Sequence, residues 1–273
     1  MADGFKLEQQ HGKGKVRVSR VWRKAGSAGA DVIVEWNVDI VLLSECLKAY
    51  TDGDNSSIVA TDTMKNTVYA KAKESTEVES VERFAIRLAT HFTSFYPQVT
   101  TAIIRIVEKP WERVIVDGRP HVHGFKLGSE KHTTEVTLQQ TGALRLISGI
   151  EGLSLLKTTQ SGFEGFVRDR YTLLPDTKER MLATELSASW RFQFESIAGI
   201  PLKQFCFSER YRDVKFPDIA SIQLKMPNLH FLPLNLSSKD NPNIVKFADD
   251  LYLPTDEPHG TIEATLSRFV SKL

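Results

Sequence analysis

Strict alternation of apolar and polar residues is the feature that most constrains how this chain folds. In residues 32–41 the even positions hold Val, Val, Trp, Val and Ile, while Glu, Asn and Asp stand at odd positions between them. A period of two places one set of side chains on a core and the other toward solvent, which is typical of an antiparallel strand. Residues 15–21 alternate similarly and connect through the flexible segment Gly26–Gly29, so the sequence predicts a β-hairpin.

Two helices are predicted to follow this hairpin. Residues 76–79, Thr-Glu-Val-Glu, match a capping box, after which apolar residues recur at helical spacing until Pro97. The residues of this apolar face are Val81, Phe84, Ala85, Leu88, Phe92 and Phe95. A weaker helix is predicted over 61–73, with Met64, Val68 and Lys71 along one side and with oxygens of residues 61–63 capping its first-turn amides.

The second half of the chain repeats the order of the first, which indicates an internal duplication. Strands are predicted at 100–107, 114–125, 132–140, 143–147, 153–157, 188–194, 221–226 and 262–267. We therefore expect two units of strand, strand, helix, helix, strand, strand, at 1–130 and 131–273. The interval 195–217 is too short for two helices of about 11 residues each. Because Pro217 stops a helix that begins near residue 210, we expect the second helix pair to be truncated around 210–217.

Composition and the chain end narrow the partners and the compartment. Lys and Arg number 35 against 34 Asp and Glu, and no run approaches the ~20 apolar residues of a spanning helix, so neither nucleic acid nor membrane is an expected partner. Ser271-Lys272-Leu273 matches the tripeptide read by the peroxisomal import receptor, which predicts a peroxisomal protein. Cys46 and Cys206 are then predicted to be free thiols.

The sequence contains no cofactor motif that we can identify. It has no Gly-x-Gly-x-x-Gly after a strand and no Cys-x-x-Cys, so no cofactor and no metal are expected. His121 and His123 have the spacing of strand residues that share a face, but two ligands are too few for a metal site and a surface pair is the preferred interpretation.

Several stretches, in order along nearly the whole chain, resemble the urate oxidase family. They are residues 11–13 with 16–18, residues 54–67, residues 161–163 with 165–169, residues 226–231, and residues 255–260 onward to the terminal tripeptide. The resemblance implies an α+β chain of tandem tunnelling-fold (T-fold) units, with antiparallel sheets, helices on one face and a tunnel-shaped homotetramer. It also implies cofactor-free oxidation of urate by dioxygen to 5-hydroxyisourate and hydrogen peroxide.

The resemblance assigns catalytic roles to three residues of this sequence. Lys13 matches the catalytic lysine, Thr61 its partner hydroxyl, and His230 the histidine that completes their relay. Without the resemblance, Lys13 would be interpreted as a solvated loop charge, Thr61 as a helix N-cap and His230 as a structural histidine. Asn228 alternates with His230 on a predicted strand, so the two side chains share a face, and it matches the asparagine of the oxygen-side pocket.

Three more residues match positions that hold urate. Arg180 matches the arginine that grips the substrate, Phe163 the aromatic ring that stacks on the purine, and Asp62 a position that contributes its backbone amide. On their own, Arg180 would be interpreted as a helix-surface charge and Phe163 as a core residue. The resemblance further implies that one subunit contributes Lys13 and Thr61 while its neighbour contributes Phe163 and Arg180.

The chain departs from the family at one place. The family interval is longer there and carries a Ser-Pro-Ser-x-Gln stretch whose Gln binds urate, whereas nothing intervenes between Lys215 and Phe216. We therefore expect an internal deletion, from an omitted exon or an altered gene model, and an impaired or inactive enzyme. The alternatives are a non-catalytic splice form that misassembles or joins intact subunits, and a T-fold purine or pterin binder with different chemistry.

Overall fold

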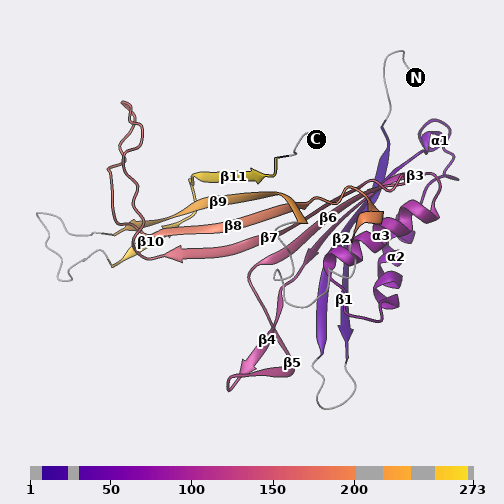
Figure 1. Ribbon diagram of the computed structural model, residues 1–273, viewed down its shortest axis with the longest axis horizontal. Helices are drawn as coiled ribbons and strands as arrows, with labels where there is room; N and C mark the ends of the chain where they lie inside the picture. Colours follow the sequence, from indigo (N-terminus) through magenta and orange to yellow (C-terminus); the bar gives the residue numbers. More distant parts are fainter. Residues whose placement is uncertain (1–7, 24–30, 201–217, 235–249, 270–273) are drawn as a thin grey trace, which may run out of the picture. The chain divides into compact units, whose positions relative to one another are not determined.

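The computed structural model of the protein describes residues 8–23, 31–200, 218–234 and 250–269 (Figure 1). The chain divides into two compact units. Unit 1 comprises Met1–Ile150, Ser189–Ile222 and Leu266–Leu273, and unit 2 comprises Glu151–Ala188 and Gln223–Thr265. These units are defined by packing, so the predicted duplication boundary between residues 130 and 131 stays a prediction.

One nine-stranded sheet contains most of the strands. Its order is β1 (Gln10–Trp22), β2 (Val32–Ser44), β3 (Val99–Glu108), β6 (Lys131–Gln139), β7 (Leu144–Lys157), β8 (Leu182–Phe192), β9 (Ile219–Pro233) and β10 (Tyr252–Thr255), with β11 (Thr261–Ser267) pairing to β9. The pairs β1–β2, β2–β3, β3–β6 and β9–β10 are all antiparallel. The predicted antiparallel fold class is therefore confirmed.

The alternating stretch that predicted the hairpin lies in β2. Its even residues from Val34 to Leu42 are each at most 1% exposed, while the odd residues between them are half-buried. Val38 pairs with Val16 of β1, and the hairpin runs from Gln10 opposite Leu43 to Trp22 opposite Val32. The pattern of residues 32–41 is thus explained by one strand face packed in the core of unit 1.

Unit 1 has three helices, of which α2 and α3 cover one face of its strands (Figure 1). They are α1 (Leu47–Thr51), α2 (Thr61–Glu74) and α3 (Val81–Phe95). α3 packs on β3 and β6, and α2 packs on β1. The predicted apolar face of α3 is buried except for Phe95, which is 67% exposed. The prediction for Phe95 was wrong because this last helical residue stacks on His91 and contacts Tyr96 instead of the sheet.

The caps of both long helices differ from the predictions. α3 does not start from a capping box at 76–79: its N-cap is Ser80, whose hydroxyl accepts from Arg83 N at 3.3 Å. Glu79 is buried instead and binds the Arg87 guanidinium at 2.8 Å. α2 has Ala60 as its N-cap, whose methyl side chain cannot accept a hydrogen bond, and the Asp62 carboxylate binds Lys65 and Asn66 instead of the first-turn amides.

The prediction of which α2 side chains face the core was partly wrong. Met64 and Val68 are buried as predicted, but the third buried residue is Ala72, and Lys71 next to it is half-buried. A helical turn of 3.6 residues brings Ala72, four residues after Val68, under the same stripe. The Lys71 ammonium reaches the Glu74 carboxylate at 2.8 Å on the exposed side.

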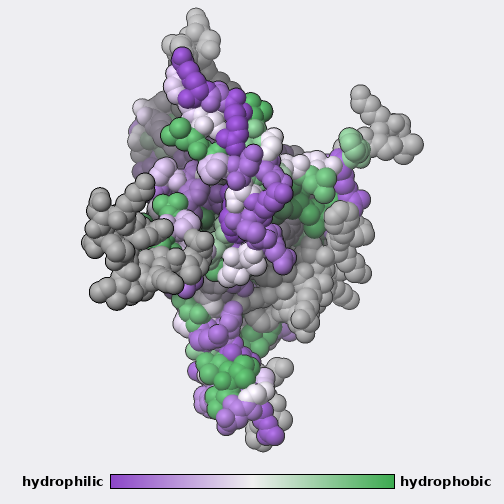
Figure 2. Space-filling view, turned by 90° about the vertical axis from the view of Figure 1, so that its left-hand side faces the viewer, coloured by the Kyte–Doolittle hydropathy of each residue, from purple (hydrophilic) through white to green (hydrophobic). Residues whose placement is uncertain are grey.

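Residues 114–125 are not one strand of the main sheet. They form a separate two-stranded sheet of β4 (Trp111–Val116) and β5 (Arg119–Leu127), which projects from the rest of unit 1 (Figure 1). Asp117 and Gly118 turn the chain with positive φ values of 50° and 74°, as tight hairpins require. Figure 2 shows apolar surface gathered at the lower end of its view, where this hairpin exposes Ile115, Val116, Val122 and Leu127.

Other elements also differ from the sequence prediction. The strands predicted at 143–147 and 153–157 are one strand, β7, which begins at Leu144, and β10, α1 and the short 3-10 helix η1 (Ile197–Gly199) were not predicted. Within the described part of residues 131–273, η1 is the only helix. The predictions for Gly26–Gly29, Cys206, residues 210–217 and Ser271–Leu273 lie outside the described residues.

Cys46 is buried and free of any disulfide, as predicted for it. None of the helices in the described ranges has the length and apolar character needed to cross a membrane.

Candidate functional site

Lys13 lies at a break in the pairing of the first hairpin. It pairs with Ile40, but the register then shifts before Val16 pairs with Val38. Lys15 has a φ of 58°, and its backbone N–H donates to Asp39 Oδ1 at 2.6 Å. Such a bulge redirects the side chains around it and is common beside functional sites. Lys13 is thus held by a strand and is not the loop charge that its sequence context alone suggests.

Gly12 brings the two strands of this hairpin unusually close. A Cβ added at Gly12 would lie 2.1 Å from the carbonyl oxygen of Ile40, a separation that no side chain can occupy. An open depression of about 440 Å³ lies beside this contact. It is lined by Gly12, Lys13, Gly14, Lys15, Asp39, Ile40, Val41 and Arg105.

The N-terminal end of α2 lies next to this part of β1. His11 Nε2 is 3.0 Å from the carbonyl oxygen of Val59, which joins β1 to the residues that precede the helix. A hydrogen bond from Lys65 and its charge lower the pKa of Asp62, and the charge of Lys13 acts in the same direction. Lys13, Thr61 and Asp62 are therefore gathered in unit 1, at a helix start whose backbone amides favour a negatively charged group.

Phe163 and Arg180 meet in unit 2. Phe163 N donates to Thr177 O at 2.7 Å, and Thr177 N donates back to Phe163 O at 3.1 Å. This bridge brings the Arg180 guanidinium carbon to 5.1 Å from the centroid of the Phe163 ring. Arg180 stands just before β8 and is not helical, and Phe163 is 41% exposed and is not a core residue. Their interpretations from local sequence alone were therefore wrong.

Both residues retain unused binding capacity. The Phe163 ring is partly open to solvent, so a flat ligand can stack on it. Arg180 Nε is buried and has no hydrogen-bond acceptor among the described residues. An unpaired buried donor costs free energy, which a ligand acceptor would recover. A planar cation beside an aromatic ring can grip the edge of a heterocycle while the ring supports its face.

Asn228 and His230 lie two residues apart on β9, so their side chains share one face of the strand. Asn228 N donates to Gly260 O at 2.7 Å, and His230 pairs with Thr255 of β10. Both residues are half-buried. These contacts anchor their backbones to residues 255–260, and both residues belong to unit 2 with Phe163 and Arg180.

The seven predicted site residues thus fall into two groups. Lys13, Thr61 and Asp62 belong to unit 1, and the other four belong to unit 2. The structure brings the residues of unit 1 together around the start of α2 and places Arg180 over Phe163 in unit 2. The sequence analysis missed the residues that stack on and support Phe163, although the second aromatic of Phe163–Phe166 was a visible signal.

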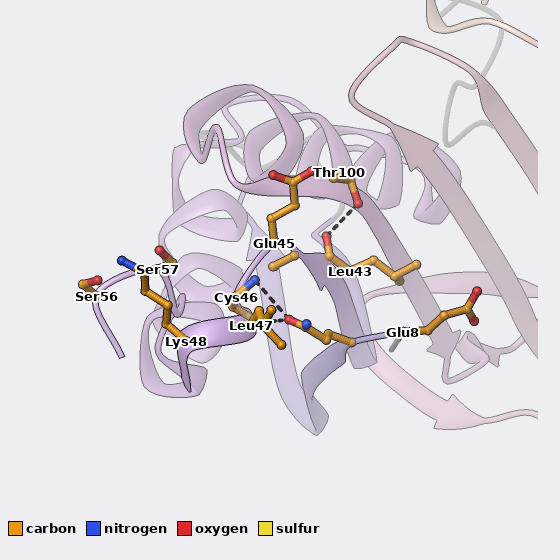
Figure 3. A pocket seen from close by; sticks show the side chains of 11 residues that line it. Glu8, Leu43, Glu45, Cys46, Leu47, Lys48, Ser56, Ser57 and Thr100 are labelled. Carbon is orange, nitrogen blue, oxygen red and sulfur yellow. Dashed lines mark hydrogen bonds between the residues drawn. The ribbon is translucent and has the colours of Figure 1, made fainter. Parts of the chain in front are cut away.

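A larger pocket of about 840 Å³ lies where β1 begins and β2 ends, and its walls include none of the predicted site residues (Figure 3). The Gln9 side-chain oxygen accepts from Cys46 N at 3.1 Å on its wall. The remaining lining comes from the ends of β1 and β2, from Leu47 and Lys48, from Ser56 and Ser57, and from Thr100. The sequence analysis had not singled out this pocket.

Fold and site together define a class of protein: antiparallel sheets covered on one face by helices, with positions suited to a small planar anion. The family model described as Uricase matches residues 9–137 and 146–216. The chain is 60% identical over 306 residues to the uricase of Arabidopsis thaliana, covering 100% of this chain and 99% of that protein. It is 58% identical over 307 residues to uricase-2 of Phaseolus vulgaris, with 100% and 99% covered.

Solved structures agree with these matches. The crystal structure of uricase from Arthrobacter globiformis superposes with a TM-score of 0.79 at 31% identity, covering 100% of this chain and 98% of that one. The chain belongs to the uricase family.

Proposed function

We propose that this protein oxidises urate with dioxygen and water to 5-hydroxyisourate and hydrogen peroxide, with no cofactor. One molecule each of urate, oxygen and water gives one of each product, so two electrons pass from the purine to oxygen and the water supplies the added hydroxyl. The observation that carries the proposal is the placement of the Arg180 guanidinium over the Phe163 ring, in a chain of the uricase family.

Binding of the substrate is assigned to five residues. Phe163 stacks on the purine, and Arg180 donates paired hydrogen bonds to an oxygen and a ring nitrogen at its edge. The backbone amides of Thr61 and Asp62, at the uncapped start of α2, donate to the opposite edge of the anion. Asn228 lines the pocket in which oxygen or water meets the face of the ring.

Proton removal is assigned to Lys13, Thr61 and His230. Lys13 acts as the base, the Thr61 hydroxyl relays the proton from urate to it, and His230 completes the relay. The bulge at Lys13 and its position near the start of α2 support the first two assignments. Removal of this proton makes the purine electron-rich enough to transfer electrons to oxygen.

The resemblance to urate oxidases implies sites that are shared between subunits. We propose a homotetramer in which one subunit contributes Lys13 and Thr61, and its neighbour contributes Phe163 and Arg180. In purine degradation the enzyme would act in the peroxisome, which it would enter through recognition of Ser271-Lys272-Leu273 by the import receptor.

Mixing of inactive variants tests the shared site. Lys13→Met and Arg180→Gln should each abolish turnover, and hybrid oligomers of the two should regain activity, because some sites then receive both wild-type halves. A matched control mixes Lys13→Met with Thr61→Val, which lie in the same half and should not complement each other. Recovery in the control, or none in the first mixture, would exclude the proposed division.

A direct assay tests the reaction itself. Purified, gel-filtered protein should remove the ultraviolet absorbance of urate and release one hydrogen peroxide for each urate consumed. Dialysis against a chelator should leave the rate unchanged. Absence of peroxide, or loss of activity that added metal restores, would contradict the proposal.

We also propose that a segment is missing at Lys215/Phe216 and that its loss weakens the activity. The match to the Arabidopsis thaliana protein extends over 306 residues although this chain has 273, and the family-model match ends at residue 216. Losing one hydrogen-bond donor to urate costs about 1–3 kcal/mol, and losing helices exposes apolar sheet surface. Sequencing the transcript across this junction tests the deletion, and turnover equal to that of a full-length relative would refute the impairment.

A further inference from the structure

We propose that Phe166 is a positioning residue that holds the Phe163 ring in place for stacking and thereby sets the affinity for flat purines. The inference rests on the proposed function, because it assigns a support to the ring on which urate stacks. It starts from one contact: the two rings are nearly parallel, with an interplanar angle of 11° and centroids 4.7 Å apart.

The backbone of Phe163 is fixed, but its exposed side chain is not fixed by the fold alone. The bridge to Thr177 holds both the N–H and the C=O of Phe163. The ring is 41% exposed, so few core contacts restrict its rotamer. A ring that must be ordered by the ligand costs binding affinity, whereas a ring ordered beforehand does not. The parallel contact with Phe166 supplies this order.

Phe166 is itself held by a cation. The Arg168 guanidinium carbon lies 4.3 Å from the Phe166 ring centroid. That guanidinium donates to Leu174 O at 2.6 Å and to Asp176 Oδ1 at 3.0 Å. The Arg168 cation is therefore fixed beside Phe166 by acceptors on the opposite arm of the loop.

The turn between the two rings depends on Gly165. Its φ of 72° lies in the left-handed region, and its N–H faces Asp176 Oδ1 at 3.3 Å. This turn brings Phe166 back onto Phe163, three residues earlier, and Asp176 contacts both the turn and Arg168. Arg180, Phe163, Phe166 and Arg168 are thus linked by successive ring contacts, all within unit 2.

In the opposite role, that of a placeholder, Phe166 occupies the face of the Phe163 ring on which the purine would stack and so competes with it. The two roles predict changes of opposite sign when the Phe166 ring is removed. A supporting ring, once lost, weakens purine binding, whereas loss of a placeholder strengthens it. A role confined to folding would instead change stability and leave the affinity of the folded protein unaltered.

The test uses the full-length protein and xanthine, a purine that lacks the C8 oxygen, with binding measured by calorimetry. Phe166→Leu should raise the Kd for xanthine, and the KM for urate, by about threefold to tenfold, the range of an aromatic pair. The kcat should stay within about twofold, since no group that moves a proton is altered. Phe166→Tyr keeps the ring and should restore the wild-type Kd.

A double-mutant cycle tests whether Phe166 acts through its partner ring. Phe163→Leu with Phe166→Leu should bind xanthine no more weakly than Phe163→Leu alone, because the support has nothing left to position. Arg168→Gln provides a second, milder perturbation that should weaken binding in the same direction while keeping both rings. Thermal unfolding of each variant identifies any that do not fold.

Three results would overturn the inference: tighter or unchanged binding in Phe166→Leu, equal losses in the Leu and Tyr variants, or additive losses in the cycle. These outcomes are separable from failure of the proposed function. Wild-type protein that neither binds xanthine nor consumes urate would refute both. Active wild-type protein whose Kd for xanthine is unchanged by Phe166→Leu would refute the inference alone.

Discussion

Replacement of Glu82 should destabilise unit 1 far more than replacement of an exposed glutamate in a similar ion pair. The Glu82 side chain is 7% exposed on α3, and its carboxylate lies 3.0 Å from His132 Nε2. Ser148 Oγ donates to the same oxygen at 2.8 Å, and Thr134 Oγ1 is 3.1 Å from Ser148 Oγ. The network joins α3 to β6 and β7 inside the core.

The magnitude follows from burial. Glu82→Gln keeps the shape and an acceptor oxygen but removes a charge-assisted hydrogen bond, which contributes about 1.5–3 kcal/mol. Glu82→Ala also leaves His132 without its buried carboxylate, and breaking such a pair costs about 3–5 kcal/mol. In a domain of this size each kcal/mol lowers Tm by about 2–4 °C, so the Ala variant should melt roughly 6–20 °C below wild type.

Glu74 is the matched control. Its carboxylate lies 2.8 Å from the Lys71 ammonium, but its side chain is 56% exposed. Exposed ion pairs contribute little because solvent screens them, so Glu74→Gln should leave the free energy of unfolding nearly unchanged. Urea and thermal denaturation followed by circular dichroism measure both variants. Equal, small effects at the two positions would refute the burial argument.

The Glu82 contribution should also depend on pH. Burial alone would raise the pKa of Glu82, but the hydrogen bond and charge of His132, with Ser148, outweigh it and leave the pKa below its ordinary value. A lowered folded-state pKa stabilises the protein above the unfolded pKa of about 4.3, and this stabilisation is lost as pH falls through the folded pKa. The difference between wild type and Glu82→Gln should therefore shrink in acid; a difference that grows there would contradict this sign.

Three further substitutions probe the site. Gly12→Ala would press a Cβ against a β2 carbonyl oxygen and should lower the free energy of unfolding, measured by urea denaturation, by about 1–3 kcal/mol. A Cβ added at Gly199 would meet no atom within 4 Å, so Gly199→Ala should lower it less. Arg180→Lys loses the planar fork and should raise the urate KM by about tenfold or more in steady-state kinetics; an unchanged KM would remove Arg180 from the binding site. Thr61→Val should lower kcat by about 100-fold, while Thr63→Val, on the same helical turn, should not; equal rates would exclude the relay.

The sequence by itself determined the local elements whose patterns are strongly periodic. Alternation along residues 32–41 predicted the first hairpin, and helical spacing from Val81 to Phe92 predicted the buried face of α3. These predictions succeeded because a single face of each element packs against the core, so burial repeats with the period of the backbone. The family was also recognisable from the sequence, because its motifs extend along nearly the whole chain.

Tertiary structure decided the features that depend on contacts between distant residues. The cap of α3 moved to Ser80 because Glu79 turned inward to Arg87, a choice invisible in a four-residue pattern. Only folding placed Arg180 over Phe163, through a bridge to Thr177 that no local propensity encodes. The stack of Phe166 on Phe163 likewise depends on the opposite arm of its loop, since aromatic and charged side chains acquire their roles from neighbours that only the fold supplies.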